Sequence, residues 1–157
     1  PPVDRGVLML YNTGSLKHPE TKNSILSNVD AMPYLKRINY SLPLDYAFPN
    51  FGWGVWFRNN AFQAILHQQD YSDENLYEQT DSTHYRVIKN HYNEGHWLIC
   101  GDIIRKEISD MVAIEQIKQH LPFSEATSII MYHLDENNLK NLDNYEISTF
   151  YSRPAAE

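Results

Sequence analysis

Side chains that could do chemistry gather in a few short stretches of the sequence. One stretch near the end of the chain holds Tyr132, His133 and Asp135, and one near its beginning holds Tyr11 and Asn12. Carboxyl groups act as acids, bases or nucleophiles in glycoside hydrolysis. All five lie at the carboxyl ends of apolar runs that predict strands, and in a barrel such positions line the site. If that site takes a sugar, Asp135 is the catalytic candidate and the other four are substrate-binding candidates.

Two tryptophans add to this set of candidates. Trp53 and Trp56 offer flat apolar faces that could stack on a sugar ring, although large aromatic side chains also commonly fill cores. Asp135 has a structural alternative as well, because Asp is favoured at the beginning of a helix. In a regular strand Tyr132 and His133 point to opposite sides, so at most one of them would face a site.

Other kinds of chemistry find little support in the sequence. His84, His91 and His96 are seven and five residues apart, a spacing that matches no compact metal-binding motif, so we expect no metal. Nucleophile elbows and glycine-rich nucleotide-binding loops are absent, and we expect no cofactor. The net charge of −7 argues against binding to nucleic acid, which requires a basic face. The single cysteine, Cys100, is interpreted as a small buried hydrophobic residue.

The elements that must position these residues follow from the hydrophobic pattern. Apolar runs without alternation predict buried strands, and apolar residues three and four apart predict amphipathic helices. Residues 53–67 predict a hairpin around Asn59-Asn60, and 70–109 an excursion of extended segments around a turn at Gly95. The expected strands are 7–12, 44–51, 126–134 and 145–151, and the expected helices are 24–37, 111–121 and 137–142.

Strands that alternate with helices are typical of consecutive βα units with a parallel sheet. We therefore predict an α/β fold, the C-terminal part of a (β/α)8 (TIM-like) barrel with an inserted β-hairpin and β excursion. Residues 1–157 would form a single unit made of the last βα units of the barrel, with 53–109 as an elaborated loop or a small β subdomain. The apolar runs are far shorter than the ~20 residues of a membrane-spanning helix, so no transmembrane segment is expected.

The segments Pro1–Asn12 and Tyr132–Leu139 carry a resemblance to a known group of proteins. They resemble uncharacterised bacterial envelope proteins with a glycoside-hydrolase-like barrel, and the resemblance covers most of the chain as the C-terminal portion of such proteins. It implies a location in the cell envelope, in the periplasm or on the outer surface, with a lipid anchor on a missing N-terminus as one option. It also implies that an upstream part of the same protein is a partner.

Three functions remain open from the sequence. The first is a glycoside-hydrolase-like protein that acts on or binds a polysaccharide or oligosaccharide, with a second catalytic carboxylate in upstream strands. The second is a non-catalytic carbohydrate-binding protein, and the third is a protein-interaction module that uses exposed aromatic and acidic surface. Whether the chain is an enzyme is undecided at this point, because the argument from fold to activity is an analogy.

Overall fold

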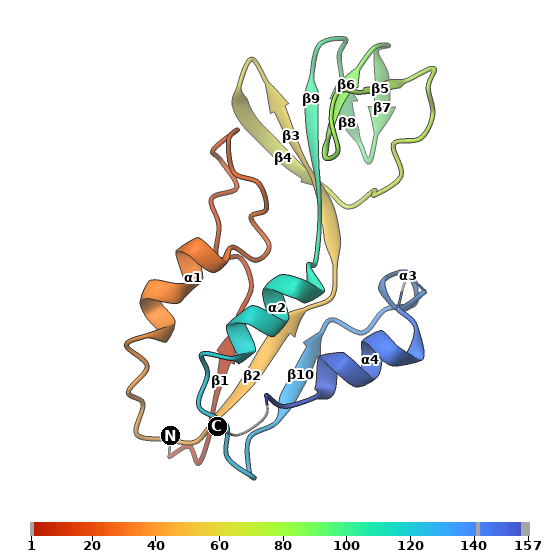
Figure 1. Ribbon diagram of the computed structural model, residues 1–157. Coiled ribbons are helices and arrows are strands. Elements are labelled where there is room, and N and C mark those ends of the chain that lie inside the picture. Colours follow the sequence, from red (N-terminus) through yellow and green to blue (C-terminus); the bar gives the residue numbers. More distant parts are fainter. Residues whose placement is uncertain (1, 141, 155–157) are drawn as a thin grey trace. The chain divides into compact units, whose positions relative to one another are not determined.

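The computed structural model describes residues 2–140 and 142–154 (Figure 1). The chain divides into two compact units, which we name by their content. The α/β unit consists of Pro1–Gly14, Ile25–Phe51 and Ser109–Glu157, and the β unit consists of Ser15–Ser24 and Gly52–Ile108.

The α/β unit is built on a parallel sheet with the strand order β1-β2-β10. Leu8 of β1 and Ile129 of β10 are both in register with Tyr46 of β2. The parallel strands expected from the three apolar runs are therefore confirmed. In chain order the elements of this unit are β1 (Gly6–Met9), α1 (Asn28–Leu35), β2 (Leu44–Pro49), α2 (Met111–Lys118), β10 (Ile129–Tyr132), α3 (Glu136–Leu139) and α4 (Asn144–Tyr151).

One face of this parallel sheet is packed and the other is open. The core of the unit combines side chains of the sheet with side chains of α1, α2 and α4, among them Tyr46, Phe48, Ile114 and Phe150. Residues of β1 and β10 on the opposite face are exposed, because side chains alternate along a strand. These exposed residues are Val7, Met9, Ile130 and Tyr132.

Each helix of eight residues begins at a side chain that accepts a backbone hydrogen bond from its first turn. Ser27 caps α1, Asp110 caps α2, and Asp143 caps α4 in a capping box with Glu146. The fully buried ammonium of Lys118 donates to the backbone carbonyl of Phe150, and so joins the end of α2 to the end of α4. Caps and this bridge satisfy polar groups that the helix ends would otherwise leave unpaired.

The β unit is antiparallel. Its five-stranded sheet has the order β4-β3-β9-β6-β5, and β7 and β8 form a separate hairpin. Asn59 and Asn60 have positive φ angles at the turn between β3 and β4, so the predicted hairpin is confirmed. The strands of this unit are β3 (Gly52–Arg58), β4 (Ala61–Leu66), β5 (Tyr77–Gln79), β6 (His84–Val87), β7 (His91–Asn93), β8 (His96–Leu98) and β9 (Ile103–Ile108).

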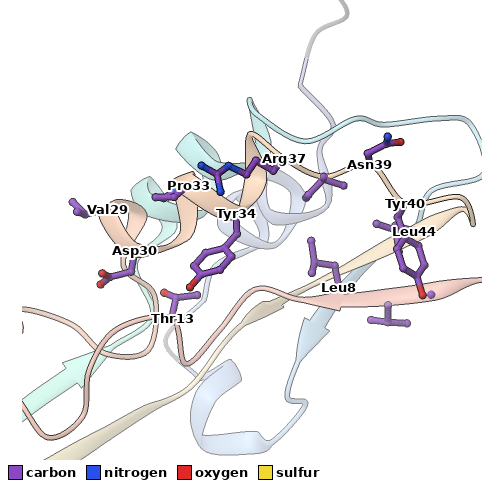
Figure 2. A pocket seen from close by; sticks show the side chains of 13 residues that line it. Leu8, Thr13, Val29, Asp30, Pro33, Tyr34, Arg37, Asn39, Tyr40 and Leu44 are labelled. Carbon is purple, nitrogen blue, oxygen red and sulfur yellow. The ribbon is translucent and has the colours of Figure 1, made fainter.

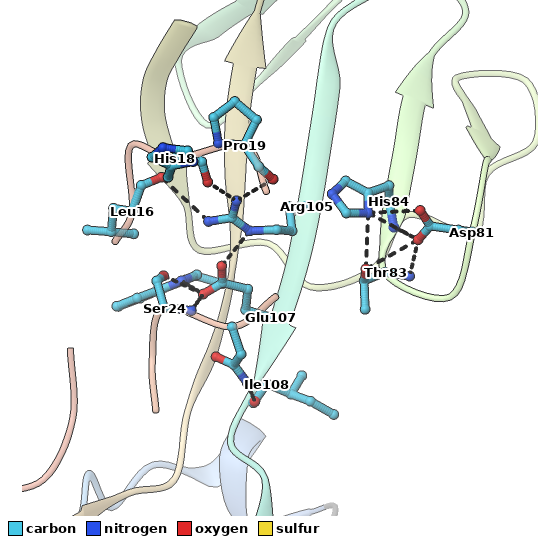
Figure 3. A network of polar contacts seen from close by, with 12 residues as sticks. Leu16, His18, Pro19, Ser24, Asp81, Thr83, His84, Arg105, Glu107 and Ile108 are labelled. Carbon is cyan, nitrogen blue, oxygen red and sulfur yellow. Dashed lines mark hydrogen bonds and ion pairs between the residues drawn. The ribbon is translucent and has the colours of Figure 1, made fainter. Parts of the chain in front are cut away.

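A buried ion pair fixes the segment 15–24 to this sheet (Figure 3). Arg105 Nε donates to Glu107 Oε1 at 2.6 Å, and both side chains are fully buried. The guanidinium also donates to the carbonyl of His18, while Glu107 accepts from the backbone and hydroxyl of Ser24 and from Trp53 Nε1. Every partner of this pair belongs to the β unit, and the charges are paired as burial requires.

The structure corrects two predictions about the fold. The fold is not part of a (β/α)8 barrel: within the described residues three sheets hold β1 to β10, most strands pair antiparallel, and no barrel is closed. A barrel needs parallel strands that close on themselves, whereas the β1-β2-β10 sheet ends at two edges. The predicted final strand at 145–151 is also wrong, because the capping box at Asp143 starts α4 there.

Two further properties concern the exposure of the cysteine and the length of the helices. Cys100 is exposed, so its interpretation as a buried residue is wrong. It follows the buried Leu98 at the end of β8, where the chain turns at the surface. Among residues 2–140 and 142–154, no helix has both the length and the apolar character needed to cross a membrane.

Candidate functional site

The carboxyl ends of β1, β2 and β10 bring three aromatic rings together in the α/β unit. The rings of Tyr11 and Tyr132 are stacked, with centroids 4.8 Å apart and planes 9° apart. The ring of Phe51 stands edge-on to both, at 6.1 Å from each centroid. Because parallel strands end at the same edge of a sheet, three segments far apart in the sequence meet here.

A close pair of polar side chains lies beside these rings. His133 Nε2 and Asp135 Oδ2 are 2.8 Å apart, and both side chains are partly exposed. The imidazole ring lies 6.2 Å from the ring of Phe51 and 5.4 Å from that of Tyr132. Tyr11, Phe51, Tyr132, His133 and Asp135 are called the strand-end site below.

Asp135 serves two structural purposes at once. Its Oδ1 accepts from the backbone N–H of Asn138 at 3.1 Å, and its Oδ2 accepts from the Asn138 side-chain amide at 2.6 Å. The first of these bonds caps the N-terminus of α3. The carboxylate is therefore held in place by α3 while it orients the imidazole of His133.

Tyr11 is an uncharged hydrogen-bonding group of the strand-end site. Partial burial, and then the neighbouring phenol of Tyr132, raise the pKa of Tyr11 above its ordinary value. Tyr11 thus stays protonated at neutral pH and can both donate and accept a hydrogen bond. Stacked rings beside hydrogen-bonding groups form a surface that suits a ligand with one apolar and one polar face.

The other predicted site residues are placed differently. Asn12 is exposed and has a positive φ of 57°, and its backbone N–H donates to the carbonyl of Ile25, so it makes the turn at the end of β1. Trp53 and Trp56 belong to the β unit. Trp56 is 6% exposed, with the guanidinium of Arg58 4.9 Å from its ring centroid, a position that favours the packing interpretation.

From the strand-end stretch 50–53 the sequence reasoning chose Trp53, and not Phe51, as a substrate-binding candidate. Phe51 directly follows the buried Asn50 at the end of β2, and its strand-end position is the signal that marks it. The buried pair of Arg105 and Glu107 was also not predicted. No sequence signal marks it, since charged residues in a strand are usually exposed.

A second feature of the α/β unit is an open groove between α1 and β1 (Figure 2). It has a volume of about 920 Å³ and is lined by both apolar and charged side chains, among them Val7, Asp30, Tyr34 and Arg37. Over the described part of the chain, no group of three or more His, Cys, Asp and Glu side chains could hold a metal ion.

Comparisons of the chain with protein-family models, with curated proteins and with solved structures gave no significant match. The chemistry of the strand-end site is therefore argued from its own geometry.

Proposed function

We propose that the α/β unit binds a polysaccharide or oligosaccharide at the strand-end site. The observation that carries the proposal is Tyr132, a residue that is 45% exposed while its ring stacks on Tyr11. An exposed aromatic residue whose ring is held by stacking offers a rigid apolar surface at little cost in conformational entropy. The apolar C–H face of a pyranose ring is a ligand that fits such a surface.

The polar pair supports the choice of a sugar over a purely apolar ligand. His133 and Asp135 lie next to the aromatic rings and can exchange hydrogen bonds with hydroxyl groups. The net charge of −7 supports a neutral ligand over a polyanion. An apolar surface with a few well-placed polar groups is the usual composition of a binding site.

Binding without hydrolysis agrees better with the contacts of Asp135. Glycoside hydrolysis generally uses two carboxyl groups on opposite sides of the scissile bond. The carboxylate that the structure places beside the aromatic rings is that of Asp135, and its two oxygens already accept bonds from Asn138. An oxygen engaged in capping α3 is a poor general acid, so we assign Asp135 to positioning His133.

The first test is a glycan array on the whole chain, followed by calorimetry with the best ligand. We expect Tyr132→Ala to weaken binding about tenfold or more, since an aromatic contact is worth roughly 1–2 kcal/mol. The matched control is Tyr145→Ala, which removes a ring that is 77% exposed on α4 and should leave the affinity unchanged. Equal affinity of Tyr132→Ala and the unmodified chain would refute the proposal, as would the absence of any glycan ligand.

Asp135→Asn separates binding from hydrolysis. The change keeps a side chain that accepts a hydrogen bond at the cap of α3 but removes the carboxylate. If the site only binds, the unmodified chain releases no reducing sugar from its ligand, and Asp135→Asn alters affinity alone. Release of sugar by the unmodified chain that Asp135→Asn abolishes would replace the binding proposal with the hydrolase hypothesis.

A further inference from the structure

The groove between α1 and β1 is bordered by apolar side chains that are open to solvent (Figure 2). Val29 and Tyr34 of α1, which both line the groove, are 83% and 78% exposed. Scattered exposed apolar residues are ordinary, but a contiguous group around one groove marks a surface for association.

The backbone of β1 has one edge that faces β2 and one that faces away from it. The amides of Gly6 and Leu10 donate to Pro43 and Ala47, on the side of β2. Because successive amides of a strand point to opposite sides, those of Val7 and Met9 point away from β2. β1 is an edge strand in the order β1-β2-β10, and an open edge of this kind pairs readily with another strand.

The groove is lined by one acidic and one basic side chain, so it is complementary in charge to the same groove of a second copy. Asp30 lies in the first turn of α1 and Arg37 follows the end of that helix by two residues, and both line the groove. Their midpoint falls between Pro33 and Tyr34, which also line the groove. If two copies of α1 pack antiparallel about that midpoint, Asp30 of each lies opposite Arg37 of the other.

We propose that β1 and α1 form the interface of a two-fold symmetric dimer of this chain. In it β1 pairs antiparallel with β1 of the second copy, centred on Leu8, so that Val7 of each copy exchanges backbone hydrogen bonds with Met9 of the other. Across the same axis α1 packs on α1 of the second copy, with Tyr34 near the axis and one Asp30–Arg37 ion pair on either side. Such an interface is isologous, and it closes after two copies.

Sedimentation equilibrium of the whole chain over a range of concentrations tests the dimer. The unmodified chain should reach twice its mass of 18.4 kDa. Asp30→Arg and Arg37→Asp should each raise the dissociation constant of the dimer about tenfold or more. Each change places two like charges opposite each other, and the two-fold axis repeats that contact. The double variant Asp30→Arg, Arg37→Asp should restore dimerisation. Glu125→Arg, the same charge reversal at an exposed position outside the groove, is the control and should change nothing.

A second variant tests the strand edge separately. Val7→Pro removes an amide that points away from β2, so pairing of β1 with β2 survives while one hydrogen bond to the second copy is lost. Circular dichroism should match the unmodified chain, and the dimer should weaken. A mass of 18.4 kDa at every concentration overturns the proposal. The proposal is also overturned if Asp30→Arg, Arg37→Asp and Val7→Pro all leave the dissociation constant unchanged. It is overturned as well if the double variant dimerises as weakly as the two single charge variants.

Discussion

The carboxylate of Asp45 connects two segments of the α/β unit that are far apart in the sequence. Arg5 Nε donates to Asp45 Oδ2 at 3.0 Å, and the backbone N–H of Ser128 donates to Asp45 Oδ1 at 2.7 Å. The hydrogen bond from Arg5, followed by that from Ser128, lowers the pKa of Asp45 to about 2. One carboxylate on β2 thereby joins the segment before β1 to the residue before β10.

This lowered pKa makes a prediction about acid stability. In the unfolded chain Asp has a pKa of about 3.9. The contribution of Asp45 to the free energy of unfolding is therefore fully present above about pH 4, and it is lost as the pH falls through about 2. Asp45→Asn should lower stability at pH 7 and flatten the decline between about pH 4 and 2. Urea titrations at pH 7, 4 and 2 measure both effects, and an unchanged slope would contradict the role given to Asp45.

Residue type together with position at the end of a predicted strand predicted part of the strand-end site. Tyr11, Tyr132, His133 and Asp135 were found because each lies at the end of a predicted buried strand. The expectation that Tyr132 and His133 diverge rested on a regular strand, but β10 ends at Tyr132 and both rings lie close to Phe51. The stacking partner of each ring depends on strand pairing, which residue types do not reveal.

At the scale of the element, β3 depends on a glycine where a tyrosine approaches its backbone. A Cβ built on Gly54 would lie 2.1 Å from Tyr71 Oη and 2.9 Å from a methyl carbon of Ile104. Tyr71 is buried and its hydroxyl donates to the carbonyl of Gln68, so the ring has little freedom to move away. The close contact explains why this strand carries a glycine at position 54, between the large side chains of Trp53 and Trp56.

Gly54→Ala should therefore destabilise the β unit. We expect a loss of about 2 kcal/mol in the free energy of unfolding, the usual cost of overpacking a core. Tyr71→Phe removes the atom nearest to the new methyl group, and the same glycine change should cost less in that background. Guanidinium unfolding of the four proteins of this double-mutant cycle gives the comparison. Identical costs in both backgrounds would show that the hydroxyl is not the obstacle.

Elements whose local composition favours one structure could be predicted from the sequence. An element whose composition favours a strand while its capping residues favour a helix could not. The apolar runs that became β1, β2 and β10 and the turn at Asn59 and Asn60 were recognised, because buried strands and left-handed turns have clear compositions. The stretch 145–151 is rich in β-branched and aromatic residues and was misassigned as a strand. There the cap formed by Asp143 and Glu146 outweighs that preference.

At the scale of the whole molecule, the chain passes between its two units at 14–15, 24–25, 51–52 and 108–109. A barrel was predicted because strands and helices alternate along the sequence, but sequence order says nothing about how many parallel strands a sheet contains. The number of strands depends on pairing between distant segments, and the residues 52–108 use their strands in an antiparallel sheet of their own. For this reason the parallel pairing was predictable and the architecture was not.

The buried ion pair makes the β unit sensitive to a single charge. Glu107→Gln leaves the guanidinium of Arg105 buried without its counter-charge, which should cost about 3 kcal/mol. Glu78→Gln, in a solvent-exposed pair with Arg86, is the control and should have little effect. Hydrogen exchange read by mass spectrometry should show faster exchange in residues 52–108 of the Glu107 variant. Faster exchange confined to residues 25–51 would contradict the assignment of this pair to the β unit.

The exposed thiol of Cys100 has a practical consequence. It is the sole cysteine of the sequence, and it lies in the β unit at the surface, after the end of β8. A maleimide dye or a nitroxide spin label would therefore attach at one known position without any prior mutation. A single fluorophore there would report on the β unit alone. With a second cysteine introduced on α4, two labels would measure the distance between the two units.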